Sequence, residues 1–249
     1  MTDIVKELYE SHVLRARERI HENAGICQLI DPGIDPIRLE RYLITYNAAG
    51  VRMTNPVEGW IRRAGERCVA IGCGDVGRSL IMHARHEANH DQMMIHDAHF
   101  LVELWNAKRA HKLDAQHLID TLSLRSVQSY IDLHEDTIAS DMPFGQVAIE
   151  FEIEALSSTI LSDFVNNWKR VLGPEIAGGL SFLEEHVEID VGHTQLNRKI
   201  MGRLLAARPE AGEALGRIGS LALDTYAAFL NECLALVDES WSREAGIAA

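Results

Sequence analysis

A helical hydrophobic period runs along nearly the whole chain and constrains its fold more than any other feature. Between residues 3 and 22, apolar side chains recur at Ile4, Leu8, Val13 and Leu14 among charged residues. This spacing favours an α-helix over the alternation expected of a β-strand. Because no segment shows convincing strand alternation, we expect an all-α protein.

Turn-forming residues divide the chain into about seven or eight helices. Asp and Pro residues between 31 and 36 predict a turn before the next helix, and Gly72–Asp75 predicts another break. Asp75 is the expected N-cap of a long helix that runs past His90 to about Ala107. Further helices are predicted at 126–139, about 144–172 and 176–206, with a last helix after residue 210.

Length and composition favour one helical domain over residues 1–249. A chain of 249 residues, 47% of them apolar, can bury a sizeable core, and no repeat or linker divides it. We find no signal region and expect no membrane-spanning run. The four cysteines form no Cys-x-x-Cys pair, which favours reduced thiols and a cytoplasmic location.

The net charge argues against a nucleic-acid partner. It is −13 at pH 7, whereas binding to phosphates needs clustered Lys and Arg. A small-molecule substrate is the partner that we expect, and the apolar content suggests a homodimer.

Two short motifs carry side chains that bind metal ions. His186, Asp190 and His193 stand at i, i+4 and i+7, so an α-helix places them on one face. Glu87 and His90 lie one turn apart on the predicted helix that begins near Asp75. Imidazoles and carboxylates that converge from different helices suit iron, manganese or zinc.

A dimetal site also needs a bridging carboxylate from a further helix. Glu150 and Glu154 lie one turn apart on a face that is otherwise apolar and small. We favour Glu154, with Glu150 close behind; an acidic stripe that faces solvent is the alternative. His83 and Asp97 share the face of Glu87 and His90, and we expect them to hydrogen bond to a ligand or within their own helix.

The run from His83 to Asp97 resembles the metal-binding helix of haem-oxygenase-like diiron oxidases and oxygenases. That family includes CADD-like proteins and the decarboxylase UndA, and it is related to the TenA/PqqC bundle. Glu87, His90 and Asp97 match its pattern, whereas His86 replaces the first acidic residue of a pair. The run from Phe182 to His193 is similar to the family's His-x-x-x-Asp-x-x-His helix, and the similarity covers about residues 5–235.

The resemblance implies a single bundle of about seven helices with two irons in its core. The implied ligands are Glu87, His90, a Glu at 150 or 154, His186, Asp190 and His193. Manganese would accept the same ligands. The implied activity is dioxygen-dependent oxidation of a small organic substrate by N-oxygenation, C–C cleavage or oxidative decarboxylation, with an external electron donor.

Three other classes of protein compete with this interpretation. A cofactor-free TenA/PqqC-like enzyme would share the bundle, but its thiaminase branch uses a mid-chain Cys, and none lies between Cys73 and Cys233. A haem protein would use His12 or His21 as its axial ligand and would not need the other ligand-type residues. A non-enzymatic interaction protein would bind no metal.

Overall fold

The computed structural model describes residues 3–244, without the side chains of 190–191 and 240–244. Those residues form helices joined by turns and short loops, and no strand occurs among them. The all-α prediction is therefore confirmed.

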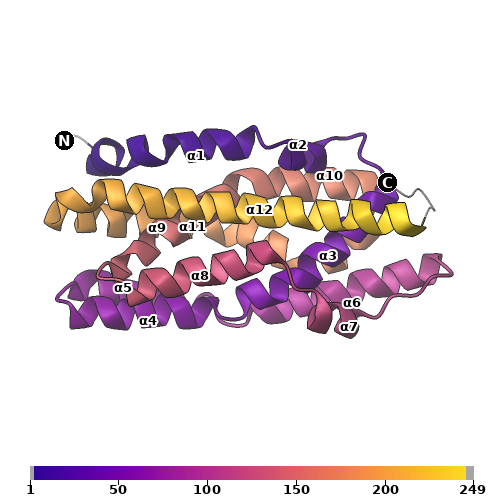
Figure 1. The fold of residues 1–249 in the computed structure, drawn as a ribbon, viewed down its shortest axis with the longest axis horizontal. Coiled ribbons are helices and arrows are strands. Elements are labelled where there is room, and N and C mark those ends of the chain that lie inside the picture. The colour runs from indigo at the N-terminus through magenta and orange to yellow at the C-terminus, as the bar shows by residue number, and fades with distance from the viewer. Residues whose placement is uncertain (1–2, 245–249) are drawn as a thin grey trace.

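The helices that build the molecule follow one another through short connections (Figure 1). In chain order they are α1 (Ser11–His21), α2 (Ala24–Ile30), α3 (Pro36–Thr54), α4 (Val57–Ala70), α5 (Gly74–Ala84), α6 (His90–Lys108), α7 (Ala115–Thr121), α8 (Arg125–Ala139), α9 (Gln146–Leu156), α10 (Ser162–Leu172), α11 (Ser181–Ala207) and α12 (Gly212–Glu244).

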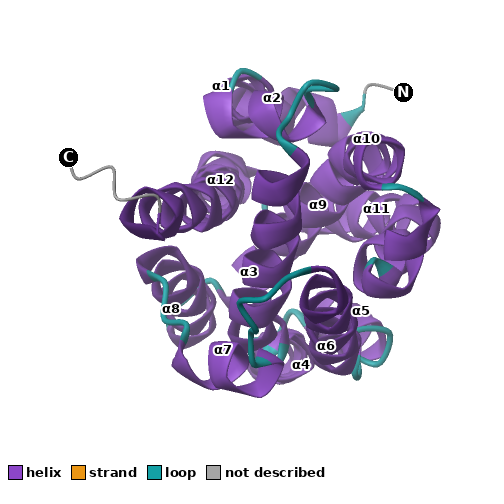
Figure 2. Cartoon of the chain, turned by 90° about the vertical axis from the view of Figure 1, so that its right-hand side faces the viewer, coloured by secondary structure: helices purple, strands orange, loops and turns teal. Residues whose placement is uncertain are grey.

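The long helix α12 runs along most of the molecule and packs against α1, α3, α8 and α9 (Figure 1). Viewed from the end, α3 and α9 lie toward the middle, with the other helices around them (Figure 2). Helix α3 also packs on α6, and α11 packs on α9. Helix α11 also packs on α5 and α6, so it joins the α5–α6 region to α9, although these segments are far apart in the sequence.

Aromatic side chains on α3 and α4 fill much of the centre. Tyr42, Tyr46 and Trp60 are almost completely buried, as the helical period predicts. The Tyr42 and Tyr46 rings stack on each other, and Tyr46 packs against Phe229 of α12. These large rings bury much apolar surface and join α3 firmly to α12.

The predicted continuous helix from Asp75 to Ala107 is wrong. Helix α5 ends at Ala84, and α6 begins only at His90. Asn89 adopts a left-handed backbone with a φ of 71°, a conformation that stops a helix and that Asn tolerates better than most residues. Helix α5 begins at Gly74, so Asp75 lies in its first turn rather than at the N-cap.

The other helix predictions need smaller changes. The segment predicted at 144–172 is helical throughout, but it widens into a π-helical turn at Ser157–Leu161 between α9 and α10. Such turns are common near functional sites. Helix α11 begins at Ser181 rather than at 176, because Pro174–Gly179 form a separate 3-10 turn.

One segment, Pro209–Glu239, is long and apolar enough to cross a membrane by length and composition alone, contrary to expectation. Core helices of soluble proteins pass the same criterion, and this segment packs along the bundle as α12. It is therefore weak support for a membrane span.

Candidate metal centre

Imidazole and carboxylate side chains from separate elements meet inside the bundle. His83 comes from the last turn of α5, Glu87 from the turn that follows it, and His90 from the first residue of α6. Helices α9 and α11 supply the rest, and the sequence separation between these elements is large. The break between α5 and α6 places Glu87 in a turn, from which it faces both neighbouring helices.

The first group of ligand atoms comprises His83, Glu87, Glu154 and His193, all within 4.8 Å of one another. The Nε2 atom of His83 lies 2.8 Å from Oε1 of Glu154 and 3.4 Å from Oε1 of Glu87. The Nδ1 atom of His193 lies 3.6 Å and 3.7 Å from the same two oxygens. Two imidazoles and two carboxylates thus converge on one point.

The second group comprises Glu87, His90 and His186. The Nδ1 atom of His90 lies 2.9 Å from Oε2 of Glu87, and the rings of His90 and His186 are 4.6 Å apart. Glu87 therefore belongs to both groups, with Oε1 toward the first and Oε2 toward the second. A carboxylate in this position suits a bridge between two metal ions.

Burial and neighbouring charges have opposite effects on the pKa values of His83 and Glu87. Burial alone would lower the pKa of His83, but the carboxylates of Glu154 and Glu87 outweigh it and raise that pKa to about 11. Burial likewise opposes ionisation of Glu87, yet His83 and His90 bring its pKa well below the usual range. The cluster thus holds positive charge beside its carboxylates, and a metal ion would take over that role by displacing protons.

Several buried imidazole nitrogens in the cluster lack a well-formed hydrogen bond. Both ring nitrogens of His83 and Nδ1 of His90 have no hydrogen-bond partner of good geometry among the described residues, although carboxylate oxygens lie near. Buried polar atoms are normally satisfied. Nitrogen and oxygen donors in this arrangement fit a first-row divalent metal such as iron or manganese.

Neighbouring groups hold the ligand side chains in place. His186 donates from Nδ1 to the Phe182 carbonyl over 2.6 Å, which fixes the orientation of its ring. Asn197 donates to Oε2 of Glu154 over 2.5 Å, and His86 contacts Nε2 of His193 at 3.2 Å. Sequence reasoning missed Asn197, although it lies one helical turn after His193 on the same stripe.

The two candidate bridging glutamates are both buried but have different surroundings. Glu154 joins the first group, as favoured from the sequence. Glu150 accepts a hydrogen bond from Nε2 of Gln146 over 2.5 Å and belongs to neither group. Burial raises the pKa of Glu150 to about 8, with a contribution from the Glu154 charge, so this carboxyl favours its neutral form.

Three predicted site residues have positions that differ from the expected ones or are not described. His83, expected to support a ligand, lies among the ligand atoms themselves. Asp97 hydrogen bonds to no described residue of either group. It accepts hydrogen bonds from Oγ of Ser181 and the backbone N–H of Phe182 at the start of α11, and its Oδ1 lies 3.3 Å from Nδ1 of His96 in its own helix, the expected alternative. The side chain of Asp190 lies outside the described residues.

The possible haem ligands lie elsewhere. His12 and His21 are both exposed on α1 and belong to neither group of ligand atoms.

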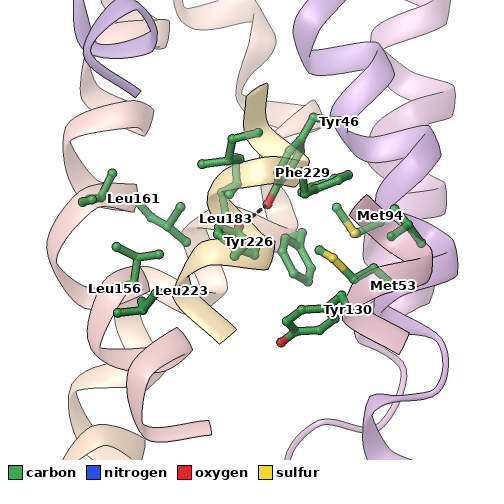
Figure 3. Close-up of a cluster of buried hydrophobic side chains, with 14 of the residues drawn as sticks. Tyr46, Met53, Met94, Tyr130, Leu156, Leu161, Leu183, Leu223, Tyr226 and Phe229 are labelled. Carbon is green, nitrogen blue, oxygen red and sulfur yellow. Dashed lines mark hydrogen bonds between the residues drawn. The ribbon is translucent and has the colours of Figure 1, made fainter. Parts of the chain in front are cut away.

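A cavity of about 70 Å³ adjoins the second group. Glu87, His90 and His186 form part of its wall. Five of the side chains labelled in Figure 3 also line it: Tyr46, Met53, Tyr130, Leu161 and Tyr226. Tyr46 and Tyr226 share a hydrogen bond of 3.1 Å on this wall. Among the described residues, the lining contains no Lys or Arg.

Comparison with known proteins shows the fold. No protein-family model and no curated protein matches the chain. A domain of unknown function with a haem oxygenase-like fold from Shewanella denitrificans OS217 matches at a TM-score of 0.73 and 14% identity, covering 97% of this chain and 95% of that domain. A TenA homologue from Pseudomonas syringae pv. tomato DC3000 matches at 0.70 and 15%, covering 93% of each chain.

These likenesses confirm the expected haem-oxygenase-like bundle. Because both identities are low, they show the fold and leave the diiron subfamily as a proposal.

Proposed function

We propose that this protein is a non-haem dimetal oxidase or oxygenase that uses iron and dioxygen to oxidise a small organic substrate. The observation that carries this proposal is the position of Glu87, whose two oxygens face two separate groups of ligand atoms. The haem-oxygenase-like fold, which is often that of an enzyme, is consistent with it. Manganese is the alternative metal.

The first metal would be held by His83, Glu87, Glu154 and His193, and the second by Glu87, His90 and His186. Asp190 remains a predicted ligand from its place between His186 and His193. When bound, two reduced irons supply the electrons that activate dioxygen, with an external donor restoring them.

The protein's own part is to orient the ligands and exclude water. Hydrogen bonds from Asn197 and to the Phe182 carbonyl keep Glu154 and His186 in one orientation. The buried Tyr46–Tyr226 pair and Leu161 line the cavity, which leaves little room for bulk water. An organic group enters this space beside the second metal position.

The charge and size of the cavity favour a small neutral or cationic group near the metals. The carboxylates of Glu87 and Glu154 line it, and among the described residues the lining has no Lys or Arg to pair with an anion. N-oxygenation of an amine fits this charge best. C–C cleavage and oxidative decarboxylation remain within the proposal where the substrate carboxylate binds a metal directly.

Anaerobic Fe(II) titration, followed by mixing with dioxygen in a stopped-flow spectrophotometer, tests the proposal. We expect about two irons per chain and a transient visible absorption band. His186→Ala should lose the band and weaken iron binding, whereas His117→Ala, at an exposed position on α7, should retain both.

A wild-type protein that binds no iron would contradict the proposal. A cofactor-free enzyme of the same fold, or a non-enzymatic interaction protein, would then be the better interpretation. The homodimer and the cytoplasmic location stay predictions, and size-exclusion chromatography with light scattering would measure the first.

A further inference from the structure

A column of aromatic rings leads from the cavity toward the surface. Tyr130, which Figure 3 labels, lines the cavity. Glu87 and His90 line the same cavity. Its ring lies 4.6 Å from the ring of His134, which stacks on Trp60 at 4.1 Å with only 10° between the planes. Tyr130 and Trp60 are themselves 6.3 Å apart.

The outer end of the column is connected to solvent by a hydrogen bond. The indole Nε1–H of Trp60 donates to Oε1 of Glu135 over 2.8 Å, and Glu135 is paired with Arg63. The side chains of Glu135 and Arg63 are 46% and 43% exposed, whereas Trp60 is 1% exposed. Both charged residues line a surface groove between α4 and α8.

A second contact joins the column to the acidic side of the cavity. The amide of Gln146 lies within 3.2 Å of Nδ1 of His134 and donates to Glu150. Burial lowers the pKa of His134 to about 3, so its imidazole is neutral. The rings of Tyr130, His134 and Trp60 therefore pack in sequence from the cavity outward. At the outer end, the hydrogen bond from Trp60 to Glu135 connects them to the groove.

Packing alone explains a buried tryptophan elsewhere in the same protein. Trp168 of α10 is as buried as Trp60 and stacks on Phe164, but its Nε1–H donates to the Leu29 backbone carbonyl. Trp168 does not line the metal cavity. Trp60 differs because its N–H faces a partly exposed carboxylate that can accept a proton, and because its neighbours reach the cavity.

We propose that an aromatic column, made up of Tyr130, His134 and Trp60, carries single electrons between the groove and the metal centre, with Glu135 as the proton acceptor at its outer end. This inference rests on the proposed function, because it needs an oxidising metal centre at the inner end. Neighbouring rings in the column are close enough for rapid electron transfer. Because the transfer rate falls steeply with distance, short steps between these rings are faster than one long transfer through the protein.

The step balances in electrons and protons. A bound metal centre would supply the oxidant after reaction with dioxygen. Trp60 would give up one electron to it, and the Nε1 proton of Trp60 would move to Oε1 of Glu135, which would leave Trp60 as a neutral radical. An external one-electron reductant at the groove then returns the electron, and Glu135 returns the proton.

Freeze-quench electron paramagnetic resonance of the iron-loaded protein after mixing with dioxygen tests this column. We expect a transient radical whose spectrum narrows in protein made with ring-deuterated tryptophan. Trp60→Phe should reduce that signal by at least about tenfold, whereas the matched control Trp168→Phe should retain it within about twofold. Reduced methyl viologen, the probe donor, should remove the wild-type radical faster than its spontaneous decay.

Glu135→Gln keeps the indole and removes the proton acceptor from a partly exposed position. We expect it to slow radical formation by about tenfold while iron stoichiometry and the thermal unfolding midpoint stay near those of the wild type. This variant decides the question if Trp60→Phe does not fold.

The outcomes separate the two proposals. If iron binds and the visible band forms, but Trp60→Phe or Glu135→Gln gives the wild-type radical, the column is overturned and the dimetal function stands. A wild-type protein that gives the band without any tryptophan radical also overturns the column alone. A protein that binds no iron overturns both.

Discussion

At the scale of single residues, Glu87 is the ligand on which the candidate centre most depends. It is the residue common to the two groups of ligand atoms, and its two oxygens lie 3.4 Å and 2.9 Å from imidazole nitrogens of His83 and His90. Its side chain keeps its charge because those imidazoles outweigh the effect of burial on its pKa. A change at Glu87 should therefore affect both metals together.

Glu87→Gln preserves the shape of the side chain and removes its charge. We expect the bound metal to fall from about two ions per chain to at most one, with affinity weakened by at least about tenfold, because an amide is a poor bridging ligand. Metal analysis after equilibrium dialysis measures this. Glu213→Gln, at an exposed position, is the control; two ions retained in Glu87→Gln would contradict a bridging role.

His134 makes a separate prediction about pH. Burial lowers its pKa from 6.5 to about 3, so between these values the unfolded chain binds a proton that the folded protein does not. The contribution of neutral His134 to stability is therefore present above pH 6.5 and is lost as pH falls toward 3. Between pH 7 and 5, metal-free wild type should lose about 2 kcal/mol more unfolding free energy than His134→Gln.

Urea unfolding at a series of pH values measures this difference. Equal pH dependence of the two proteins would show that folding does not lower the pKa of His134.

At the scale of elements, the break between α5 and α6 builds much of the centre. Had the chain continued as one helix, Glu87 would lie within it, between His83 and His90. Instead α5 ends at Ala84, and the left-handed Asn89 starts α6 in a new direction with His90 as its first residue. The interruption lets His83, Glu87 and His90 meet side chains from α9 and α11.

Asn89→Ala should destabilise the protein by about 1 kcal/mol, because a left-handed backbone costs a residue with a Cβ about that much. Asn89→Gly should retain or raise stability. Iron affinity should follow the same order, since Glu87 lies two residues away in the same turn. Thermal unfolding and iron titration of both variants measure these effects; a fully stable Asn89→Ala with normal iron binding would refute the role of this turn.

A side chain of α6 caps the N-terminus of α11. Asp97 of α6 accepts hydrogen bonds from Ser181 and from the backbone of Phe182, and so satisfies donors at the N-terminus of α11. One turn later in α11 stands His186, which hydrogen bonds back to the Phe182 carbonyl. Asp97 thus positions the ligand helix through its first turn, although it hydrogen bonds to no described ligand itself.

At the scale of the whole molecule, metal ions would join the α5–α6 region to α9 and α11 through the bundle core. The unfolded chain lacks that arrangement, so metal binding should stabilise the folded protein. At a free metal concentration about 100 times Kd, each independent site contributes about 2.7 kcal/mol. The thermal unfolding midpoint should therefore rise with Fe(II) or Mn(II) and fall again with a chelator.

Calorimetry under anaerobic conditions measures this shift, and His193→Ala should reduce it. An unchanged midpoint of the wild type at saturating metal would contradict a centre that joins these helices.

The sequence alone determined the helical class and named most of the residues that the structure brings together in the candidate centre. The 3.6-residue period marked the core faces of α3 and α4, and the spacing of His186 and His193 indicated one helix face. Glu154 was the favoured bridging residue, and it lies in the first group. These features are local, because period and spacing depend only on helix geometry.

Only the tertiary structure decided how those residues combine. Four features depend on which helices pack together: the interruption of the helix before His90, the position of His83 in the cluster, the hydrogen bonds of Asp97 to α11, and the contact of Asn197 with Glu154. The spacing of residues along a helix determines which side of that helix a side chain faces. It does not determine which other helix packs against that side. The physical reason is that packing between distant segments, rather than local propensity, chose the partner of each buried polar group.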